Sequence, residues 1–296
     1  MMGAAALVAR AIVLSAITIA VGAVVFRLSV IARATGVADA VLAEWNTRST
    51  RLGALAAAAI VLVAPARLYF QAASFVMEGD PVMPMMRNVL MTGWGRGWKA
   101  QAGIALVACV ALWLARRVTA MWAVAALAVL ALSATPAFMG HAAAAEHLAA
   151  LSVGADWTHV IAAGAWIGTL VFLAIVVGGR DSDVDGATAA RAIECFHPVA
   201  LASAAILVAT GVTSLWLRVE HLADLLHSAY GAILGVKLAL TAGVAAVGLH
   251  HSRHGVRLAR AGGPAALRRT LLGETLLAAG VIAATAALIA TSPHVD

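Results

Sequence analysis

Eight apolar segments constrain the fold of this 296-residue chain more than any other feature. A transmembrane helix needs about 20 predominantly apolar residues. The segments that approach this length are 4–31, 52–77, 98–115, 119–140, 156–178, 197–218, 230–251 and 271–291. Inside a bilayer the backbone polar groups must be satisfied internally, and runs of this length favour helices. We therefore predict an all-α polytopic bundle of about eight transmembrane helices.

The composition agrees with a membrane domain surrounded by lipid. The chain is 63% hydrophobic and 11% charged, whereas a soluble domain carries about 25% charged residues. We expect one integral domain over residues 1–296, with the first apolar segment retained as a span. A short likeness between 92–106 and 228–240 leaves open two four-helix halves, 1–140 and 141–296. The pair Gly164 and Gly168 predicts close helix packing.

The basic residues predict how the chain is oriented. Cytoplasmic loops of membrane proteins carry an excess of Lys and Arg. Thirteen of the twenty Lys and Arg residues fall at one face, in or near alternate connections, and five fall at the opposite face. We expect the richer face to be cytoplasmic and both termini to be periplasmic. The net charge of +6 is thereby explained without a nucleic-acid partner.

The connection between the fourth and fifth segments carries the main candidate site. It contains His141 and His147, and we expect Asp156 and His159 to open the following helix on one face, three residues apart. Ionisable groups in membrane helices are expensive and usually functional. We predict a metal site on the outer face held by His141, His147 and His159. Asp156 would orient His159, and Trp166 would pack over the site.

Methionines on the same face indicate which metal is bound. The polar segment 77–91 holds Met83, Met85 and Met86, and Met139 lies two residues before His141. Thioethers select Cu(I), and imidazole accepts either copper state. We therefore predict Cu(I) or Cu(II) at this face, captured by a mobile methionine loop. One alternative is that the methionines only contribute to packing. Another is that His141 and His159 only cap the helix ends that flank the connection.

A second group of ligands lies at the opposite face. Cys195 and His197 are expected at the start of the sixth helix, and His250 and His251 at the end of the seventh. A thiolate with imidazoles can release copper toward the cytosol, so these residues form a candidate exit site. The alternative is that they are polar residues that simply end membrane helices.

Two other classes of function are open from the residues alone. A b-type cytochrome needs one histidine on each of two helices at matched depth. His141 with His159, and His197 with His250, meet that requirement. A copper-binding assembly factor or sensor without transport is the third candidate. The sequence contains no nucleophile–base arrangement, phosphate loop or HExxH motif, so we do not expect an enzyme.

Several segments, taken in order, resemble a known family. They are TGWGRGW at 92–98, GHA at 140–142, DWTHVIAAGAWIGTLVFLAIV at 156–176, FHPVALASAAILVATGV at 196–212 and SAYGAILGVKLAL at 228–240. In this order and spacing they resemble the CopD family of bacterial copper resistance membrane proteins. The resemblance covers the second to eighth segments.

The resemblance implies a role in copper transport across the bacterial inner membrane. It implies movement from periplasm to cytoplasm and a periplasmic CopC-like copper carrier as partner. We expect that partner to be a separate chain, because no CopC-like β-domain is visible in the sequence. We assign neither the His197 side chain nor the methionine segment a role from the family pattern. A homo-oligomer is left open.

Overall fold

The computed structural model describes residues 2–77, 79–140, 148–177, 184–219, 225 and 227–291. Within these ranges the chain forms helices and turns, and no strand. Eight helical segments of the described chain are long and apolar enough to cross a membrane. The predicted all-α class and the predicted number of spans are therefore confirmed.

The spans are built from α-helices with three π-helical segments. The first half contains α1 (Met2–Phe26), η1 (Arg27–Ile31), α2 (Asp39–Ala73), α3 (Val82–Met91), α4 (Gly93–Leu114) and α5 (Met121–Met139). The second half contains α6 (Ala149–Ala163), η3 (Gly164–Gly168), α7 (Thr169–Val176), α8 (Gly186–Arg218), α9 (Ala229–His250), η5 (His251–Gly255) and α10 (Val256–Leu288).

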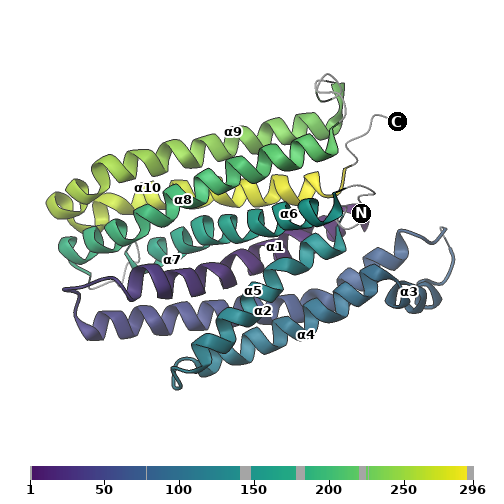
Figure 1. Ribbon diagram of the computed structural model, residues 1–296, viewed down its shortest axis with the longest axis horizontal. Helices are drawn as coiled ribbons and strands as arrows, with labels where there is room; N and C mark the ends of the chain where they lie inside the picture. Colours follow the sequence, from purple (N-terminus) through teal and green to yellow (C-terminus); the bar gives the residue numbers. More distant parts are fainter. Residues whose placement is uncertain are drawn as a thin grey trace.

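The long helices lie side by side, and α1 begins and α10 ends at the end of the bundle that carries α3 (Figure 1). Helix α1 packs against members of both halves, because it contacts α2, α5, η3, α7 and α10. Helix α9 lies at one edge, where it packs mainly against α10. The second half thus meets the first largely through α1.

Glycines let α1 and η3 approach very closely. A Cβ on Gly22 would lie 2.3 Å from the carbonyl carbon of Gly168, and a Cβ on Gly168 would lie 2.2 Å from the Thr18 oxygen. A Cβ on Gly164 would lie 2.6 Å from that of Val21. Small residues allow such contacts between membrane helices. The close packing predicted for the Gly164 and Gly168 pair is confirmed.

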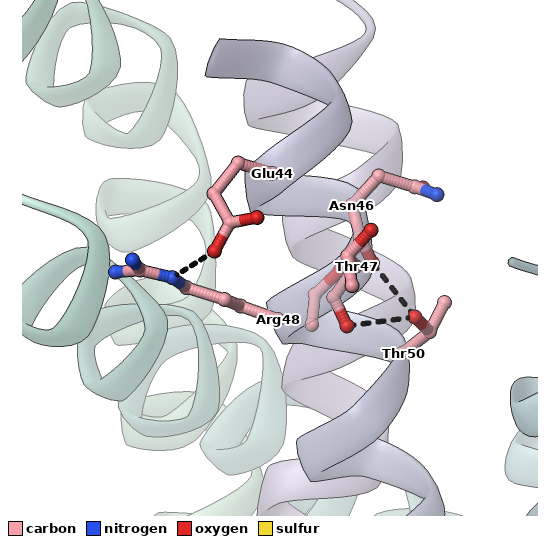
Figure 2. A network of polar contacts seen from close by, with 6 residues as sticks. Glu44, Asn46, Thr47, Arg48 and Thr50 are labelled. Atoms are coloured by element: carbon pink, nitrogen blue, oxygen red, sulfur yellow. Dashed lines mark hydrogen bonds and ion pairs between the residues drawn. The ribbon is translucent and has the colours of Figure 1, made fainter. Parts of the chain in front are cut away.

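Helix α2 begins at Asp39, well before the apolar run predicted at 52. Several polar side chains of its first turns form hydrogen bonds within the helix (Figure 2), whereas the buried Asn46 Oδ1 has no partner among the described residues. Arg48 Nε donates to Glu44 Oε1 at 2.6 Å, and Thr50 Oγ1 donates to the Asn46 oxygen at 2.8 Å. The apolar run that begins at 52 therefore covers only part of this helix.

Helices α6 and α8 also begin earlier than the predicted positions 156 and 197. Helix α8 begins at Gly186, where Asp185 accepts a hydrogen bond from the Thr188 backbone at 2.7 Å. This bond to the carboxylate lowers the pKa of Asp185. Helix α6 begins at Ala149. Asp156 and His159 therefore lie inside a helix and not at its opening.

Candidate functional site

The interface between α6 and α8 contains two polar contacts within the membrane-spanning helices. His159 Nδ1 lies 2.9 Å from Thr210 Oγ1. One turn toward the start of α6, Ser214 Oγ donates to Asp156 Oδ1 at 3.3 Å. The two helices run antiparallel here, since the earlier residue of α6 meets the later residue of α8. The structure thus places both predicted α6 residues on the face that meets α8.

Thr210 determines the direction of its hydrogen bond with His159. The Thr210 hydroxyl has one proton and lies 2.7 Å from the carbonyl oxygen of Ile206, which can only accept. The imidazole must then donate from Nδ1 to Thr210 Oγ1. In the neutral ring, Nε2 then carries the lone pair. This is the tautomer that can bind a metal ion through Nε2. In metal-binding histidines, the ring nitrogen that does not bind the metal usually donates a hydrogen bond to a neighbouring group.

His159 lies deeper than the sequence predicted. It is the eleventh residue of α6, about 15 Å along the helix axis from Ala149. Trp157 Nε1 donates to Ser133 Oγ at 3.0 Å, which sets the level of α6 against α5. By that register Met139, the last residue of α5, lies about 12 Å nearer the membrane surface than His159. The prediction of a first-turn histidine is wrong.

Of the other ligands predicted near His159, some lie outside the described residues. His141 and His147 lie outside the described residues. Met139 is half-buried and packs against the start of α4, where a Cβ on Gly97 would lie 2.5 Å from its Cγ and 3.4 Å from its Sδ. The methionine sulfur therefore lies where α4 begins and α5 ends.

The methionine segment is a short helix and not the mobile loop that was predicted. Helix α3 packs against α2 and α4. Met85 and Met86 are partly buried against the cluster of Leu68, Ala72 and Val89. Met83 points outward and is 63% exposed. The three candidate methionines therefore differ, because two serve packing and one is available at the surface.

Beneath α3 a buried polar chain crosses three helices, and sequence reasoning missed it. Arg67 on α2 donates to Gln101 Oε1 on α4, and Gln101 Nε2 donates to Thr135 Oγ1 on α5 at 2.6 Å. The Arg67 guanidinium also lies 5.9 Å from the centre of the Trp94 ring. The sequence did offer a signal for this chain, because Gln101 is a glutamine inside an apolar segment. Arg67 is thus held by contacts with α4, near the start of that helix.

The candidate exit residues are only partly described. Cys195 is buried inside α8, His197 is half-buried, and His250 ends α9. The rings of His250 and His254 stack with centroids 4.7 Å apart. The side chain of His251 lies outside the described ones. Among the described side chains, no three His, Cys, Asp or Glu residues come close enough together to hold a metal ion.

A buried carboxylate in α10 is the other residue that sequence reasoning missed. Glu274 is 1% exposed, and its Oε1 lies 3.2 Å from the point where a Cβ on Gly248 would stand. Trp166 Cζ2 lies 3.9 Å from the same point. The Trp166 ring therefore reaches α9. An acid within an otherwise apolar span was the signal that the sequence offered.

Comparisons with known proteins point to one family. The family model for the copper resistance protein D-like N-terminal domain matches residues 1–151, and the model for copper resistance protein D matches residues 190–288. Copper transport protein CutJ of Bacillus subtilis (strain 168) is 27% identical over 157 residues. That match covers 53% of this chain and 28% of CutJ, so the chain spans little more than a quarter of the relative's length. No solved structure matches the chain.

Proposed function

Because this chain belongs to the copper resistance protein D family, we propose that it carries copper from the periplasm to the cytoplasm through a His and Met site at the periplasmic face. The chain is a multi-pass protein of the bacterial inner membrane. The names of the family and of CutJ point to copper transport rather than to an enzyme.

The observation that carries the proposal is the hydrogen bond of His159 with Thr210. It gives a membrane-embedded imidazole the tautomer in which Nε2 binds metal. Asp156, one turn nearer the start of α6, supplies negative charge beside it. A cation entering the membrane needs such compensation, because charge inside a bilayer is costly.

We assign the other outer residues to capture. Exposed Met83 and the sulfur of Met139 are soft donors at the end of the bundle that carries α3. His141 and His147 follow Met139 closely in the sequence. Copper captured by these residues would pass to His159, with Met85 and Met86 contributing to the packing of α3. A periplasmic CopC-like carrier, as a separate chain, would deliver the ion.

The inner end is assigned to release. Cys195, His197, His250 and His251 would accept copper that leaves the path. Among the described side chains, no three such ligands form a closed site. Loose donors suit release, because a closed thiolate and imidazole cage would retain copper.

Copper binding to purified full-length protein tests the site. We expect His159→Ala to lose one bound copper ion, with the remaining capture site intact. His141→Ala and the double variant decide whether the two histidines share that ion. Since His159 lies about 12 Å below the end of α5, we expect the two losses to add. A double variant no worse than either single variant would instead mean one shared ion.

The ultraviolet–visible spectrum of the same samples tests the haem alternative. The family and CutJ are both named for copper, and no finding supports haem. We expect copper without a Soret band. A Soret band that disappears in His159→Ala would replace the copper proposal with a cytochrome.

A further inference from the structure

A groove between α4 and α5 opens toward the lipid. Helix α4 lies at the edge of the bundle opposite α9 and packs against α5 (Figure 1). The groove has a volume of about 480 Å³, and it is lined by apolar residues, among them the exposed Ala100, Gly103, Val107, Val124, Leu127 and Ala131. Ligand sites measure roughly 300–1,000 Å³ and are mostly apolar. The groove is therefore large enough for an elongated apolar ligand that enters from the membrane.

Two exposed cations precede the groove on the same face of α4. Arg96 and Lys99 are three residues apart, and Gly103 of the groove follows Lys99 by four, so the three are neighbours on the helix surface. Within the described part of the chain, neither cation forms an ion pair with a carboxylate. Helical side chains tilt toward the helix start, and long cationic side chains extend toward water. The two charges therefore lie above the groove, at the membrane surface.

Tryptophans mark the start of α4 as the level of the lipid headgroups, because tryptophan is enriched at membrane interfaces. Trp98 Nε1 donates to a backbone oxygen of α2 at 2.9 Å, and the Trp94 ring lies beside an arginine of the same helix. Each tryptophan is two residues from Arg96, so the rings lie toward α2 and Arg96 lies on another face. From Ala100 to Val107 the groove runs about 10 Å along α4, within one leaflet of a hydrocarbon core about 30 Å thick.

We propose that this groove binds an anionic glycerophospholipid, with an acyl chain between α4 and α5 and the phosphate at Arg96 and Lys99. The apolar lining matches hydrocarbon, and the two cations match the negative headgroup. Basic residues at a membrane surface attract anionic lipids, and arginine can bind a phosphate through two N–H groups. None of these residues belongs to the copper path proposed above.

A second copy of the chain fits the same groove less well. Copies that share one orientation in a membrane pair about an axis along the membrane normal. Pairing through this face would bring Arg96 and Lys99 of each copy to the same depth as those of the other copy. Like charges at one level repel each other, whereas a lipid phosphate brings the opposite charge.

Native mass spectrometry of purified full-length protein tests the site, with phosphatidylglycerol and phosphatidylcholine of the same acyl chains added in turn. We expect the wild type to bind phosphatidylglycerol more tightly, because its headgroup carries a net negative charge. Arg96→Gln combined with Lys99→Gln should weaken phosphatidylglycerol binding about tenfold or more and remove the preference. The matched control is Arg116→Gln combined with Arg117→Gln, beyond the other end of α4, which should keep the preference.

A pair of glycine variants tests the groove itself. An added Cβ has nothing within 4 Å at Gly103 in the groove, and nothing within 4 Å at the exposed Gly235 of α9. Gly103→Leu therefore fills the groove without displacing packed side chains, and Gly235→Leu makes the same change elsewhere. We expect Gly103→Leu to weaken the binding of both lipids and Gly235→Leu to weaken neither.

Three results would overturn the lipid site: equal affinity of the wild type for the two lipids, equal effects of the two charge-removing pairs, or wild-type lipid binding by Gly103→Leu. A wild-type dimer that Gly103→Leu separates into monomers would assign the groove to a second copy instead. Copper is absent from these measurements, so their failure leaves the proposed function standing.

Discussion

At the scale of single residues, the His159 ring is oriented by its hydrogen bond with Thr210. Thr210→Val keeps the shape of the side chain and removes the acceptor for Nδ1. Loss of such a partner lowers metal affinity about 10- to 100-fold. We therefore predict a weakening of this order in copper affinity, measured by competition with a chromogenic copper(I) chelator.

Thr213→Val is the matched control for that variant. Thr213 lies on the same helix and donates to the Ala209 oxygen of its own helix, at 2.9 Å. We expect the control to bind copper like the wild type. Equal effects of the two variants would mean that Thr210 contributes to helix packing and not to the site.

The sequence allowed His159 and Asp156 to be chosen, but not their partners. Their spacing of three residues on one helix indicates a shared face. Thr210 and Ser214 lie more than fifty residues away, and only the register between α6 and α8 brings them into contact. Glu274 differs, because a carboxylate within an apolar segment was visible in the sequence.

At the scale of elements, the crossing of α1 and η3 controls how the two halves fit. Gly22→Ala or Gly168→Ala would place a Cβ within about 2.5 Å of the facing backbone, which cannot be relieved by moving a side chain. Overpacking of this kind costs typically 1–3 kcal/mol, and backbone contacts exceed the usual case. We predict a large loss of thermal stability in detergent, measured as the temperature at which monodisperse protein disappears.

Gly103→Ala on α4 is the control for the crossing, because nothing lies within 4 Å of its added Cβ. It should be as stable as the wild type. A wild-type melting temperature for Gly168→Ala would contradict the close contact between α1 and η3.

The methionines of α3 give a second prediction for an element. Met83 and Met91 are exposed, whereas Met85 and Met86 pack against α2 and α4. We expect a variant with Leu at 83 and 91 to take up less copper at limiting concentration and a normal amount at saturation. The variant with Leu at 85 and 86 is the control and should behave like the wild type. Equal uptake by all three proteins would mean that α3 does not capture copper.

Element boundaries were less predictable than element number. Span length follows from bilayer thickness, so the count of eight could be read from the apolar runs. The start of α2 could not, because Arg48 and Thr50 satisfy their polar groups within the helix beyond the apolar run. Helix α3 could not be predicted either, because its short segment contains enough polar residues to resemble a loop.

At the scale of the whole molecule, the basic residues predict the orientation in the membrane. Ala150 lies in the first turn of α6 and Ala120 directly precedes α5, at opposite ends of these two neighbouring helices; both are exposed. The start of α6 lies at the end of the bundle where α1 begins (Figure 1). In a background without Cys109 and Cys195, a cysteine at 150 should react with a membrane-impermeant thiol reagent in intact spheroplasts. A cysteine at 120 should react only after lysis. The reverse pattern would place the His159 end in the cytoplasm.

The arrangement of helices around α1 could not be predicted from the sequence. Small residues occur throughout the chain, with 26 glycines, and their presence does not say which helices meet. The contacts of α1 with both halves, among them the close approach of Gly22 to Gly168, are visible only in the structure.

Copper uptake into sealed vesicles of known orientation tests the central claim most directly. Wild-type protein should accumulate copper(I) when the face with the termini and His159 meets the external solution. His159→Ala should reduce this accumulation to the level of protein-free vesicles, and His227→Ala, which changes a histidine beyond the spans, should not. Wild-type vesicles that accumulate no more copper than protein-free vesicles, or unimpaired uptake by His159→Ala, would contradict the account.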